Sequence, residues 1–420
     1  MNNPSNASES LCRFCSAKLV HEVVDLGMSP LCQKHIRPDQ TNDMEKFYPL
    51  HAYVCDNCWL VQLQEFATPD EIFAEEYAYF SSYSSSWLKH AQDYTTLMRE
   101  RYEIASDNLV VEIASNDGYL LQWFVAENIP VLGIEPAQNV AKVAREKGIR
   151  TETMFFGQDT ARKLRDKYGK ADLLLGNNVL AHVPDINDFV SGMKTLLGEK
   201  GVVTMEFPHL QKLIEMNQFD TIYHEHFSYL SFVAVNRIFK QHGITLFDVQ
   251  ELDSHGGSLR IFGKHTEDHT KPITDAVSSL LDREIALGME TVGYYNAFEE
   301  KVKGTKRALL DFLIAAKREG KTVVGYGAPG KGNTLLNYCG IRSDFLDYTV
   351  DLSPHKQGNF LPGTHIPIYH PERIRETKPD YVLILPWNLK KEISQQMHFI
   401  SDWGGRFVIP IPKVQVLDNL

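Results

Sequence analysis

Short apolar segments alternate with segments of amphipathic, helical pattern along the middle of the chain. Each apolar segment has the length of a buried strand, and most are followed by a stretch whose spacing suits a helix with one buried face. Such alternation is typical of an α/β fold with a mostly parallel sheet. We expect the strands of this sheet within residues 108–121, 129–135, 172–183, 201–207, 244–250 and 258–263.

The same alternation begins again near the carboxyl end. Residues 270–319 are helical in pattern, and the next apolar stretch leads into a glycine-rich turn. Further apolar segments, at 345–351, 381–385 and 406–410, predict the strands of a second Rossmann-like unit. Toward the amino end we expect short strands at 51–55 and 59–63 and a helix at 87–102.

The turn after the first strand of the middle unit differs from the glycine-rich turn of dinucleotide-binding sheets. Its residues, Ala114 to Gly118, carry side chains where a pyrophosphate needs bare backbone. S-adenosylmethionine has no pyrophosphate, so the turn favours this cofactor. Glu135 ends the next strand about twenty residues later, where an acid binds ribose hydroxyls. The expected cofactor-binding residues are Glu112, Asn116, Asp117, Gly118, Glu135 and Asn177.

The turn of the carboxyl-terminal unit does have the dinucleotide spacing of glycines. Gly325, Gly327 and Gly330 form a G-x-G-x-x-G pattern, and Lys331 brings the stretch close to a phosphate-binding P-loop. Gly332 stands where such a loop has the hydroxyl that binds magnesium, so the P-loop match is incomplete. A bare turn before a helix, next to a cation, fits a diphosphate. NAD is therefore an alternative ligand for this turn.

Composition and charge exclude several kinds of partner. The chain has 420 residues, 43% hydrophobic and 23% charged, which suits two or three globular domains. Its formal net charge of −11 argues against broad contact with nucleic acid or an anionic membrane. The sequence shows neither a segment as long as a transmembrane helix nor an apolar signal core near its start. We therefore expect a cytoplasmic protein, and the domain layout would permit a monomer.

Four of the six cysteines form two CxxC pairs, Cys12 with Cys15 and Cys55 with Cys58. Two such pairs supply the tetrahedral thiolate shell that zinc prefers. Disulfides are the competing interpretation, and the expected cytoplasmic location disfavours them. Because four cysteines leave no coordination position open, we expect the zinc ion to be structural.

The densest group of ionisable residues lies at 221–229, which contains Tyr223, His224, Glu225 and His226. An extended backbone would place the tyrosine and the glutamate on one side and both histidines on the other, whereas a turn would bring all four closer. A carboxylate beside an imidazole is the usual pair for general-base catalysis. The competing interpretation is a polar strand end with satisfied hydrogen bonds, and the density of ionisable groups favours catalysis.

His182 follows a predicted strand at the edge of the sheet where open α/β folds bind ligands. Asn177 and Asn178 lie at the same edge, and they support a functional role for His182. A histidine that only satisfies a buried backbone group is the alternative.

Four stretches together resemble the zinc-containing sugar 3-C-methyltransferases, which act on nucleotide-linked 4-keto deoxysugars. They are the two CxxC pairs, residues 77–83, residues 220–231 and residues 330–340. The resemblance spans nearly the full length and implies S-adenosylmethionine and structural Zn²⁺ as cofactors. It implies a small zinc-binding domain (1–75), a Rossmann-like class I methyltransferase domain (76–270), and a helical linker with a Rossmann-like domain that helps to bind the nucleotide sugar (271–420).

The resemblance also implies roles for single residues. The family's active-site histidine and its neighbouring tyrosine and glutamate match His226, Tyr223 and Glu225, and its second histidine matches His182. Its amino-terminal active-site tyrosine matches Tyr77, with Tyr79 as the other register. The implied reaction is enolate formation at C3, next to a C4 ketone, followed by transfer of the sulfonium methyl to C3. The expected substrate-binding residues are Tyr79, Asn178, His224, Lys331, Asn333 and Lys356.

The sequence departs from the family at one loop, and two other functions are compatible with parts of the chain. Residues 352–354 read Leu-Ser-Pro where many relatives have Arg-Asn-Pro, which is compatible with GDP in place of dTDP as the nucleotide. The first other function is an NAD-linked nucleotide-sugar oxidoreductase or epimerase that uses the second turn. The other is a non-catalytic zinc scaffold. The cluster of ionisable residues argues against the scaffold, and the unsuited first turn argues against NAD in the middle unit.

Overall fold

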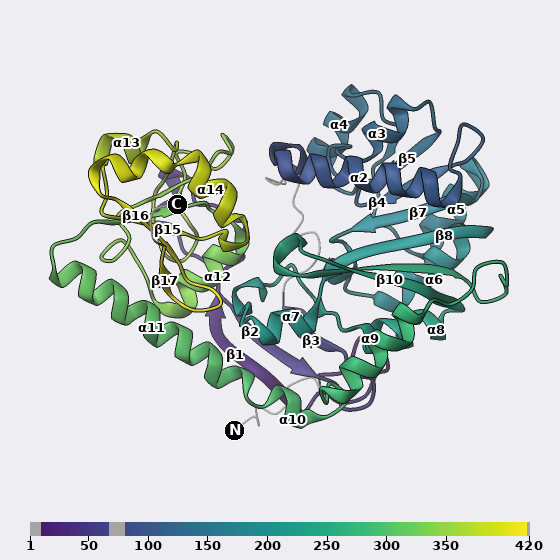
Figure 1. Cartoon of the computed structure of the whole chain (residues 1–420), viewed down its shortest axis with the longest axis horizontal. Coiled ribbons are helices and arrows are strands. Elements are labelled where there is room, and N and C mark those ends of the chain that lie inside the picture. Colours follow the sequence, from purple (N-terminus) through teal and green to yellow (C-terminus); the bar gives the residue numbers. More distant parts are fainter. Residues whose placement is uncertain (1–9, 67–79, 418–420) are drawn as a thin grey trace, which may run out of the picture.

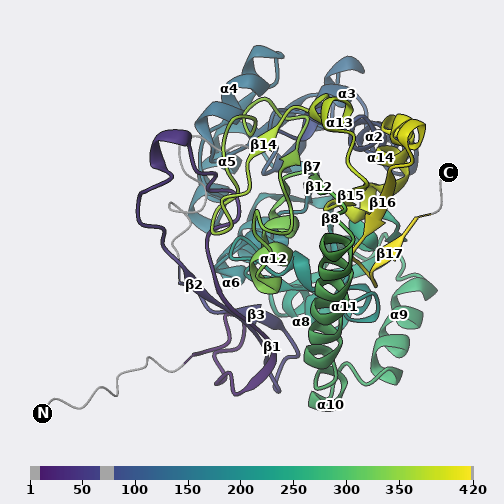
Figure 2. The same cartoon turned by 90° about the vertical axis from the view of Figure 1, so that its left-hand side faces the viewer.

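The computed structural model describes residues 10–66 and 80–417. Within these residues the chain forms three β-sheets, which Figures 1 and 2 show from two sides. The middle and carboxyl-terminal sheets occupy separate halves of Figure 1, with strands β1 and β2 below and between them. The predicted α/β class is confirmed.

The amino-terminal sheet is antiparallel, with the strand order β1-β2-β3-β9. Its strands are β1 (His21–Ser29), β2 (Tyr48–Val54), β3 (Val61–Leu63) and β9 (Ser228–Tyr229). The apolar stretches at 51–55 and 59–63 therefore form strands close to their predicted bounds. Because β9 follows the candidate catalytic residues directly, the amino-terminal sheet holds one end of that segment.

The middle sheet has seven strands in the order β10-β11-β8-β7-β4-β5-β6. They are β4 (Val110–Ile113), β5 (Val131–Ile134), β6 (Thr151–Glu152), β7 (Ala171–Asn177), β8 (Leu197–Pro208), β10 (Ile244–Leu252) and β11 (Ser258–His265). The associated helices are α2 (Ser85–Tyr102), α3 (Leu121–Ala126), α4 (Gln138–Glu146), α5 (Gln158–Tyr168), α6 (Ile186–Leu196), α7 (Leu210–Glu215) and α8 (Phe232–Gln241). Strands β4 to β8 are parallel to their neighbours among themselves, and β11 runs antiparallel to both β8 and β10. This confirms the Rossmann-like sheet and its closing pair of strands.

A helical connection leads to the third sheet. It consists of α9 (Asp275–Ala286), α10 (Val292–Tyr295) and α11 (Phe298–Arg318). The strands of this sheet have the order β14-β13-β12-β15-β16-β17. They are β12 (Val323–Tyr326), β13 (Thr349–Val350), β14 (Ile368–Tyr369), β15 (Tyr381–Ile384), β16 (Arg406–Ile409) and β17 (Gln415–Val416). The associated helices are α12 (Gly330–Cys339), α13 (Arg373–Thr377) and α14 (Lys390–Gln396). The strand expected at 345–351 is shorter, because the N–H groups of Phe345 and Leu346 bond the Arg342 carbonyl in a turn.

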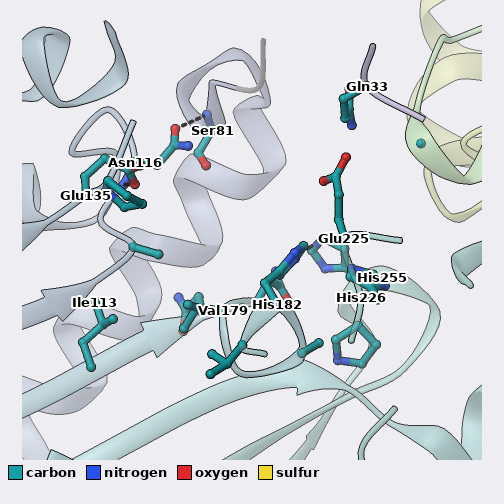
Figure 3. A pocket seen from close by; sticks show the side chains of 18 of the residues that line it. Gln33, Ser81, Ile113, Asn116, Glu135, Val179, His182, Glu225, His226 and His255 are labelled. Atoms are coloured by element: carbon teal, nitrogen blue, oxygen red, sulfur yellow. Dashed lines mark hydrogen bonds between the residues drawn. The ribbon is translucent and has the colours of Figure 1, made fainter. Parts of the chain in front are cut away.

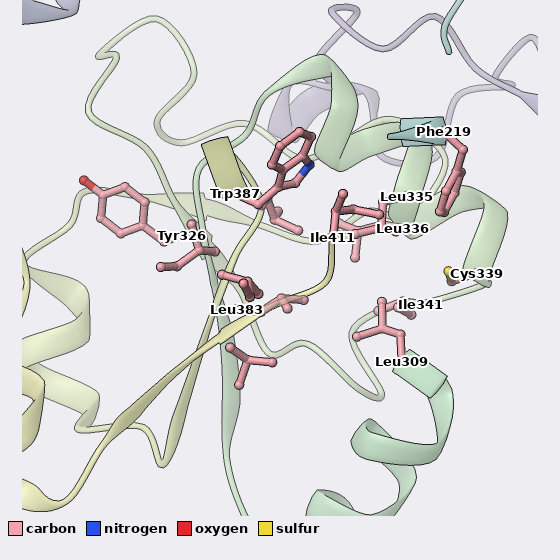
Figure 4. Close-up of a cluster of buried hydrophobic side chains, with 14 of the residues drawn as sticks. Phe219, Leu309, Tyr326, Leu335, Leu336, Cys339, Ile341, Leu383, Trp387 and Ile411 are labelled. Carbon is pink, nitrogen blue, oxygen red and sulfur yellow. The ribbon is translucent and has the colours of Figure 1, made fainter. Parts of the chain in front are cut away.

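The carboxyl-terminal sheet and the amino-terminal strands share one hydrophobic core. Val24 and Leu50 of the amino-terminal sheet belong to the same buried cluster as Leu309 of α11 and Leu335 of α12. Figure 4 shows part of this cluster, with Phe219 packed beside α12. The segment that precedes the candidate catalytic residues is thus anchored in the carboxyl-terminal half, and the division at 75 and 270 stays a prediction. In the described residues, no helix combines the length and apolar character needed to cross a membrane.

Candidate functional site

A cavity of about 680 Å³ lies where three parts of the chain meet. Its wall combines turns at the edge of the middle sheet, the segment around His226, the turn after β12, and Gln33 from the segment after β1 (Figure 3). The predicted site residues that line it are Asn116, Glu135, Asn177, Asn178, His182, Tyr223, Glu225, His226, Lys331 and Lys356. The structure therefore brings residues from the predicted cofactor, catalytic and substrate groups into one space.

Glu135 holds the first turn in place. Its carboxylate accepts the backbone N–H of Asn116 at 3.0 Å and that of Ala137 at 2.8 Å. Burial raises the pKa of Glu135 to about 7, and the two hydrogen bonds oppose that rise. Asn116, in the left-handed region with φ 49°, accepts the N–H of Ser81 at 2.9 Å. Both residues face the cavity where the cofactor was predicted.

The other residues predicted from this turn lie behind it. Glu112 is fully buried in β4, where burial and the charge of Glu135 raise its pKa. Asp117 pairs with Lys147 at 3.3 Å. A Cβ on Gly118 would meet the Ile149 side chain at 2.2 Å, so this glycine permits close packing. Glu112, Asp117 and Gly118 do not line the cavity, and their contact with a cofactor stays a prediction.

An apolar slot beside the turn was not predicted. Its wall contains Ile113, Ile134, Met154, Phe155 and Phe156. Aliphatic and aromatic side chains next to an acid that is predicted to bind ribose suit a planar aromatic base. The sequence signal was the pair of phenylalanines shortly after β6, at the same sheet edge as Glu135.

The segment with the candidate catalytic residues is a turn. The N–H of His226 bonds the Tyr223 carbonyl at 2.8 Å. This turn sends Tyr223, Glu225 and His226 to the cavity, whereas His224 packs against the amino-terminal sheet and donates to the Pro49 carbonyl at 3.1 Å. The turn alternative is confirmed. His224 does not line the cavity, so its predicted contact with substrate finds no support in this geometry.

His226 has the geometry of a neutral base. Its Nδ1 lies 2.8 Å from the Thr221 carbonyl oxygen, which can only accept, so Nδ1 carries the proton and Nε2 keeps its lone pair. Its ring centroid is 4.1 Å from that of Tyr223 and 4.6 Å from that of His182. Burial first, and then His182 and Lys331, lower the pKa of His226 well below its usual value. The imidazole is therefore uncharged at neutral pH.

The second histidine and its neighbouring asparagines lie just beyond β7. His182 ends a short 3-10 helix, Leu180–His182, and burial lowers its pKa to about 4. Asn177 donates to the Tyr119 hydroxyl at 3.4 Å. Asn178 has a left-handed backbone, with φ 55°. The carboxyl edge of β7 thus contributes a neutral imidazole and two amides to the cavity, as the sequence predicted for this edge.

Glu225 occupies a different environment from His226. It is buried, and burial raises the pKa of its carboxyl group to about 7. The Cys32 thiol, 3.4 Å from Oε1, and the charge of Lys356 act in the opposite direction. A carboxyl group with this pKa changes charge near neutral pH, so it can accept or donate a hydrogen bond to a ligand.

The glycines of the second turn are covered by other parts of the protein. A Cβ on Gly327 would meet Pro386 at 2.6 Å, and a Cβ on Gly330 would meet the Cys32 sulfur at 2.9 Å. These contacts occupy space that a dinucleotide pyrophosphate would need next to bare backbone. The bare backbone on which the NAD alternative depended is thus covered at Gly327, whereas Gly330 still lines the cavity.

Two lysines of the carboxyl-terminal unit nevertheless reach the cavity. Lys331 donates to the Asn388 side chain at 2.9 Å, and Lys356 donates to the Ala328 carbonyl at 2.9 Å. Both side chains line the cavity. Asn333 is fully buried in α12 and does not line the cavity. Contact of Lys331 and Lys356 with an anionic substrate is compatible with this geometry, and direct contact of Asn333 is not supported by it.

Tyr77 and Tyr79 lie outside the described residues. After them, Ser81 and Trp87 line the cavity, and so does His255 from the turn between β10 and β11. The Trp87 and His255 rings meet edge to face at 5.0 Å between centroids. None of these three was among the predicted site residues. A serine just before a helix is also a common capping residue, so its residue type gave little signal.

The four paired cysteines form a compact cluster. The sulfur atoms of Cys12, Cys15, Cys55 and Cys58 all lie within 4.8 Å of one another, and all four thiols are free. A zinc ion about 2.3 Å from each sulfur needs sulfurs about 3.8 Å apart. The sulfurs of Cys12 and Cys58 are 3.5 Å apart, as are those of Cys15 and Cys55. Gln62 donates to the Cys12 sulfur at 3.1 Å, as expected near a metal-bound thiolate. The donor set fits structural zinc.

Family models match three successive parts of the chain. They describe a putative zinc binding domain at residues 12–73, a methyltransferase domain at 87–249 and a C-methyltransferase C-terminal domain at 253–412. C-methyltransferase NovU of Streptomyces niveus is 36% identical over 410 residues, which cover 97% of this chain and 96% of NovU. A ubiquinone biosynthesis O-methyltransferase of Bartonella quintana (strain Toulouse) is 22% identical over 212 residues, 50% of this chain and 72% of that protein.

A solved structure was compared with this chain as well. The PH0226 protein of Pyrococcus horikoshii OT3 is 14% identical and aligns over 45% of this chain and 95% of its own, with a TM-score of 0.38. Because this score is below 0.5, the fold assignment rests on the strand order and the sequence matches.

Proposed function

This chain belongs to the zinc-containing, S-adenosylmethionine-dependent C-methyltransferases, and from that premise we propose that it methylates C3 of a dTDP- or GDP-linked 4-keto-6-deoxyhexose. The observation that carries the proposal is the position of the neutral His226. It lines the same cavity as Glu135, next to the predicted cofactor turn, and as Lys331 and Lys356 of the carboxyl-terminal unit. A methyl donor at the turn and a nucleotide diphosphate at the lysines would both have their reactive ends near His226.

Proton removal is the step that the residues around His226 support. A C4 ketone acidifies the C3 hydrogen, because the charge of the resulting enolate rests on oxygen. Nε2 of His226 accepts the C3 proton while Nδ1–H stays bonded to Thr221. S-adenosylmethionine, when bound, supplies the electrophilic methyl group. The new C–C bond forms as the S–CH₃ bond breaks, the ketone is restored, and His226 later returns its proton to solvent.

Tyr223 and His182 support stabilisation of the enolate oxygen. Both rings pack directly on His226, within 4.1 and 4.6 Å between centroids. The Tyr223 phenol can donate a hydrogen bond to a developing oxyanion, and a buried site strengthens that interaction. The single N–H of neutral His182 bonds the Glu225 backbone in the ligand-free protein, so His182 can donate to the enolate only if that bond is exchanged. The depressed pKa of His182 keeps it in the neutral form near pH 7. Tyr77, outside the described residues, stays a predicted partner of the sugar.

The test is a mass-spectrometric assay of the zinc-loaded protein with S-adenosylmethionine and a panel of dTDP- and GDP-linked 4-keto-6-deoxyhexoses. We expect a gain of one methyl group on one sugar, with deuterium exchange at C3 in heavy water. His226→Asn should abolish methylation and leave nucleotide-sugar affinity within about threefold, because Asn cannot take the proton at neutral pH. His242→Asn is the matched control, since the His242 ring bonds Ser191 and Asn187 and does not line the cavity.

Two results would overturn the proposal. Absence of a methylated product with the whole panel, together with thermal stabilisation by NAD, would support the oxidoreductase instead. Loss of nucleotide-sugar binding along with activity in His226→Asn would assign His226 a structural role.

A further inference from the structure

Two residues of the zinc-binding segment reach the cavity from outside the middle sheet. Cys32 and Gln33 follow β1, and the next residues are fixed by the bridge between Ile36 and Phe360 of the carboxyl-terminal half. Gln33 lines the cavity, and Cys32 is only 2% exposed directly behind it. This segment therefore lies between the catalytic turn and the carboxyl-terminal half.

The Cys32 thiol is bonded to a candidate catalytic residue. Its Sγ lies 3.4 Å from Oε1 of Glu225. Burial raises the pKa of Cys32 well above its usual value, so the sulfur carries a proton and acts as the donor. A donor fixed on one carboxylate oxygen restricts the rotation of Glu225 and favours its anionic form. The other oxygen can then bind a ligand.

The start of α12 is shaped to admit this segment. A Cβ on Gly330 would lie 2.9 Å from the Cys32 sulfur, 3.5 Å from Gln33 Nε2 and 3.6 Å from Tyr223. A side chain at Gly330 would thus push both residues from their positions. The absence of a side chain at position 330 serves the approach of Cys32 and Gln33.

The side-chain oxygen of Gln33, beside Gly330, is a hydrogen-bond acceptor without a donor. Its Oε1 is buried and has no hydrogen-bond partner among the described residues. Figure 3 shows the Glu225 carboxylate directed toward the Gln33 side chain across the cavity. A buried amide oxygen without a partner costs free energy unless a ligand supplies the donor. Each of these oxygens can accept a hydrogen bond from a hydroxyl or amine group.

We propose that the zinc-binding segment completes the substrate site, with Cys32 as a positioning residue for Glu225 and Gln33 as a specificity-determining residue that accepts a hydrogen bond from a hydroxyl or amine of the substrate. This inference rests on the proposed function for the identity of the substrate. The placement of Cys32 against Glu225 can be tested without any substrate.

Several groups face Glu225 and set its charge. The groups that act on its carboxylate are the Cys32 thiol and the Lys356 side chain, whereas the His182 ring bonds only the Glu225 backbone. Among them, the Cys32 hydrogen bond lowers the pKa of Glu225. Loss of the thiol should raise that pKa further, whereas a hydroxyl should restore the bond because it is also a donor.

The experiment uses full-length, zinc-loaded protein and its Cys32→Ala, Cys32→Ser and Cys339→Ser variants. Infrared difference titration would follow the carboxyl band that disappears in Glu225→Gln. We expect Cys32→Ala to raise the titration midpoint by about half to one pH unit and Cys32→Ser to return it toward the wild-type value. Cys339 is a buried thiol in α12 that supplies no interaction to Glu225, so Cys339→Ser should leave the midpoint unchanged. An unchanged midpoint in folded Cys32→Ala, or an equal shift in Cys339→Ser, would overturn the positioning role.

The second arm measures kinetics with the panel sugar that the wild-type protein methylates. Gln33→Leu should raise KM about tenfold with kcat within about threefold, and the acid limb of the Cys32→Ala pH profile should move to higher pH. An unchanged KM in Gln33→Leu would overturn the role of Gln33. If the wild-type protein methylates no sugar of the panel, the proposed function fails, while the infrared titration still decides whether Cys32 positions Glu225.

Discussion

The two Rossmann-like sheets use the same acid-to-turn hydrogen bond in different surroundings. In the middle sheet Glu135 binds the N–H of Asn116 at 3.0 Å, and in the carboxyl-terminal sheet Asp351 binds the N–H of Ala328 at 2.8 Å. Each acid follows the strand next to the first strand of its sheet. Glu135 lines the cavity, whereas Asp351 does not and instead lies 3.5 Å from Lys356. Equivalent positions in the two sheets therefore differ in access to a ligand.

The difference shows what a glycine pattern does and does not indicate. The first turn lacks the G-x-G-x-x-G spacing and opens to the cavity. The second has that spacing, yet Pro386 covers Gly327, and Cys32 packs against Gly330 at the cavity wall. Glycine permits close approach to the backbone, and either a phosphate or another part of the chain can be the group that approaches. Only the tertiary structure decides between them.

The largest expected effect compares the two acids directly. Glu135→Ala should weaken binding of S-adenosylhomocysteine about 100-fold, because it removes both the acceptor for ribose hydroxyls and the anchor of the turn. Asp351→Ala should change that affinity less than about twofold, because Asp351 is remote from the first turn. Isothermal titration calorimetry would measure both, with circular dichroism as the folding control. Equal losses in the two variants would show that the second acid also supports the cofactor site.

A second comparison tests whether glycines serve packing in both turns. Gly118→Ala and Gly327→Ala should each lower the free energy of unfolding by about 2–3 kcal/mol, from left-handed strain plus a steric clash. Gly148 has φ +81° with no atom near its Cβ position, so Gly148→Ala isolates the strain and should cost about 1 kcal/mol. Urea denaturation gives the three values. A Gly327→Ala protein as stable as the wild type would revive the interpretation of this turn as a nucleotide site.

Strands could be predicted from the sequence where the residues of a single segment form a recognisable pattern. Strands β4, β7 and β8 each contain a short apolar run of the length of a buried strand, and the closing pair β10 and β11 flanks a tight turn. Strand β9 could not be predicted from the sequence, because its two residues pair with β3, which lies far away in the sequence. The shared core of the amino- and carboxyl-terminal sheets depends on similar long-range packing and has no local pattern.

The site residues likewise divide into those that a local sequence pattern predicted and those that depend on long-range contacts. The spacing of Asn116 and Glu135 relative to the strands was enough to place both at the cavity. Asp117 belongs to the same turn, but its pairing with Lys147 directs it elsewhere. Cys32 was interpreted as a packed thiol, and its contact with Glu225 joins residues 193 positions apart in the sequence. Sequence patterns predicted several residues that line the cavity, whereas side-chain direction and contacts between distant segments required the structure.

A third prediction tests whether Lys331 of the carboxyl-terminal unit contacts the nucleotide or only packs within the protein. Lys331→Met should weaken dTDP and GDP binding about tenfold and reduce its salt dependence, while S-adenosylhomocysteine affinity stays the same. Lys317→Met is the control, because Lys317 pairs with Asp347 at the end of α11, away from the cavity. Fluorescence or calorimetric titration at two salt concentrations would measure the effect. Unchanged nucleotide affinity in Lys331→Met would leave the second unit without a demonstrated ligand contact.

The smallest expected effect is the pH dependence of cofactor binding at the first turn. Burial raises the pKa of Glu135 to about 7, above its unfolded value, so protonation of Glu135 stabilises the ligand-free protein below that pH and this contribution is lost as pH rises through 7. Ribose hydroxyls bind the ionised form better, so cofactor affinity should change in the opposite sense. It should fall about fivefold between pH 7 and pH 6, where the ionised fraction drops from about one half to about one tenth.

Two variants identify the titrating group. Glu135→Gln should flatten the dependence of S-adenosylhomocysteine affinity on pH, because the amide does not ionise. Glu225 also has a pKa of about 7 and lines the cavity, so Glu225→Gln must be compared and should retain the wild-type dependence. A flat profile in Glu225→Gln with an unchanged profile in Glu135→Gln would transfer the titration to the catalytic turn. The acid of the first turn would then resemble Asp351, binding its own backbone without binding the cofactor.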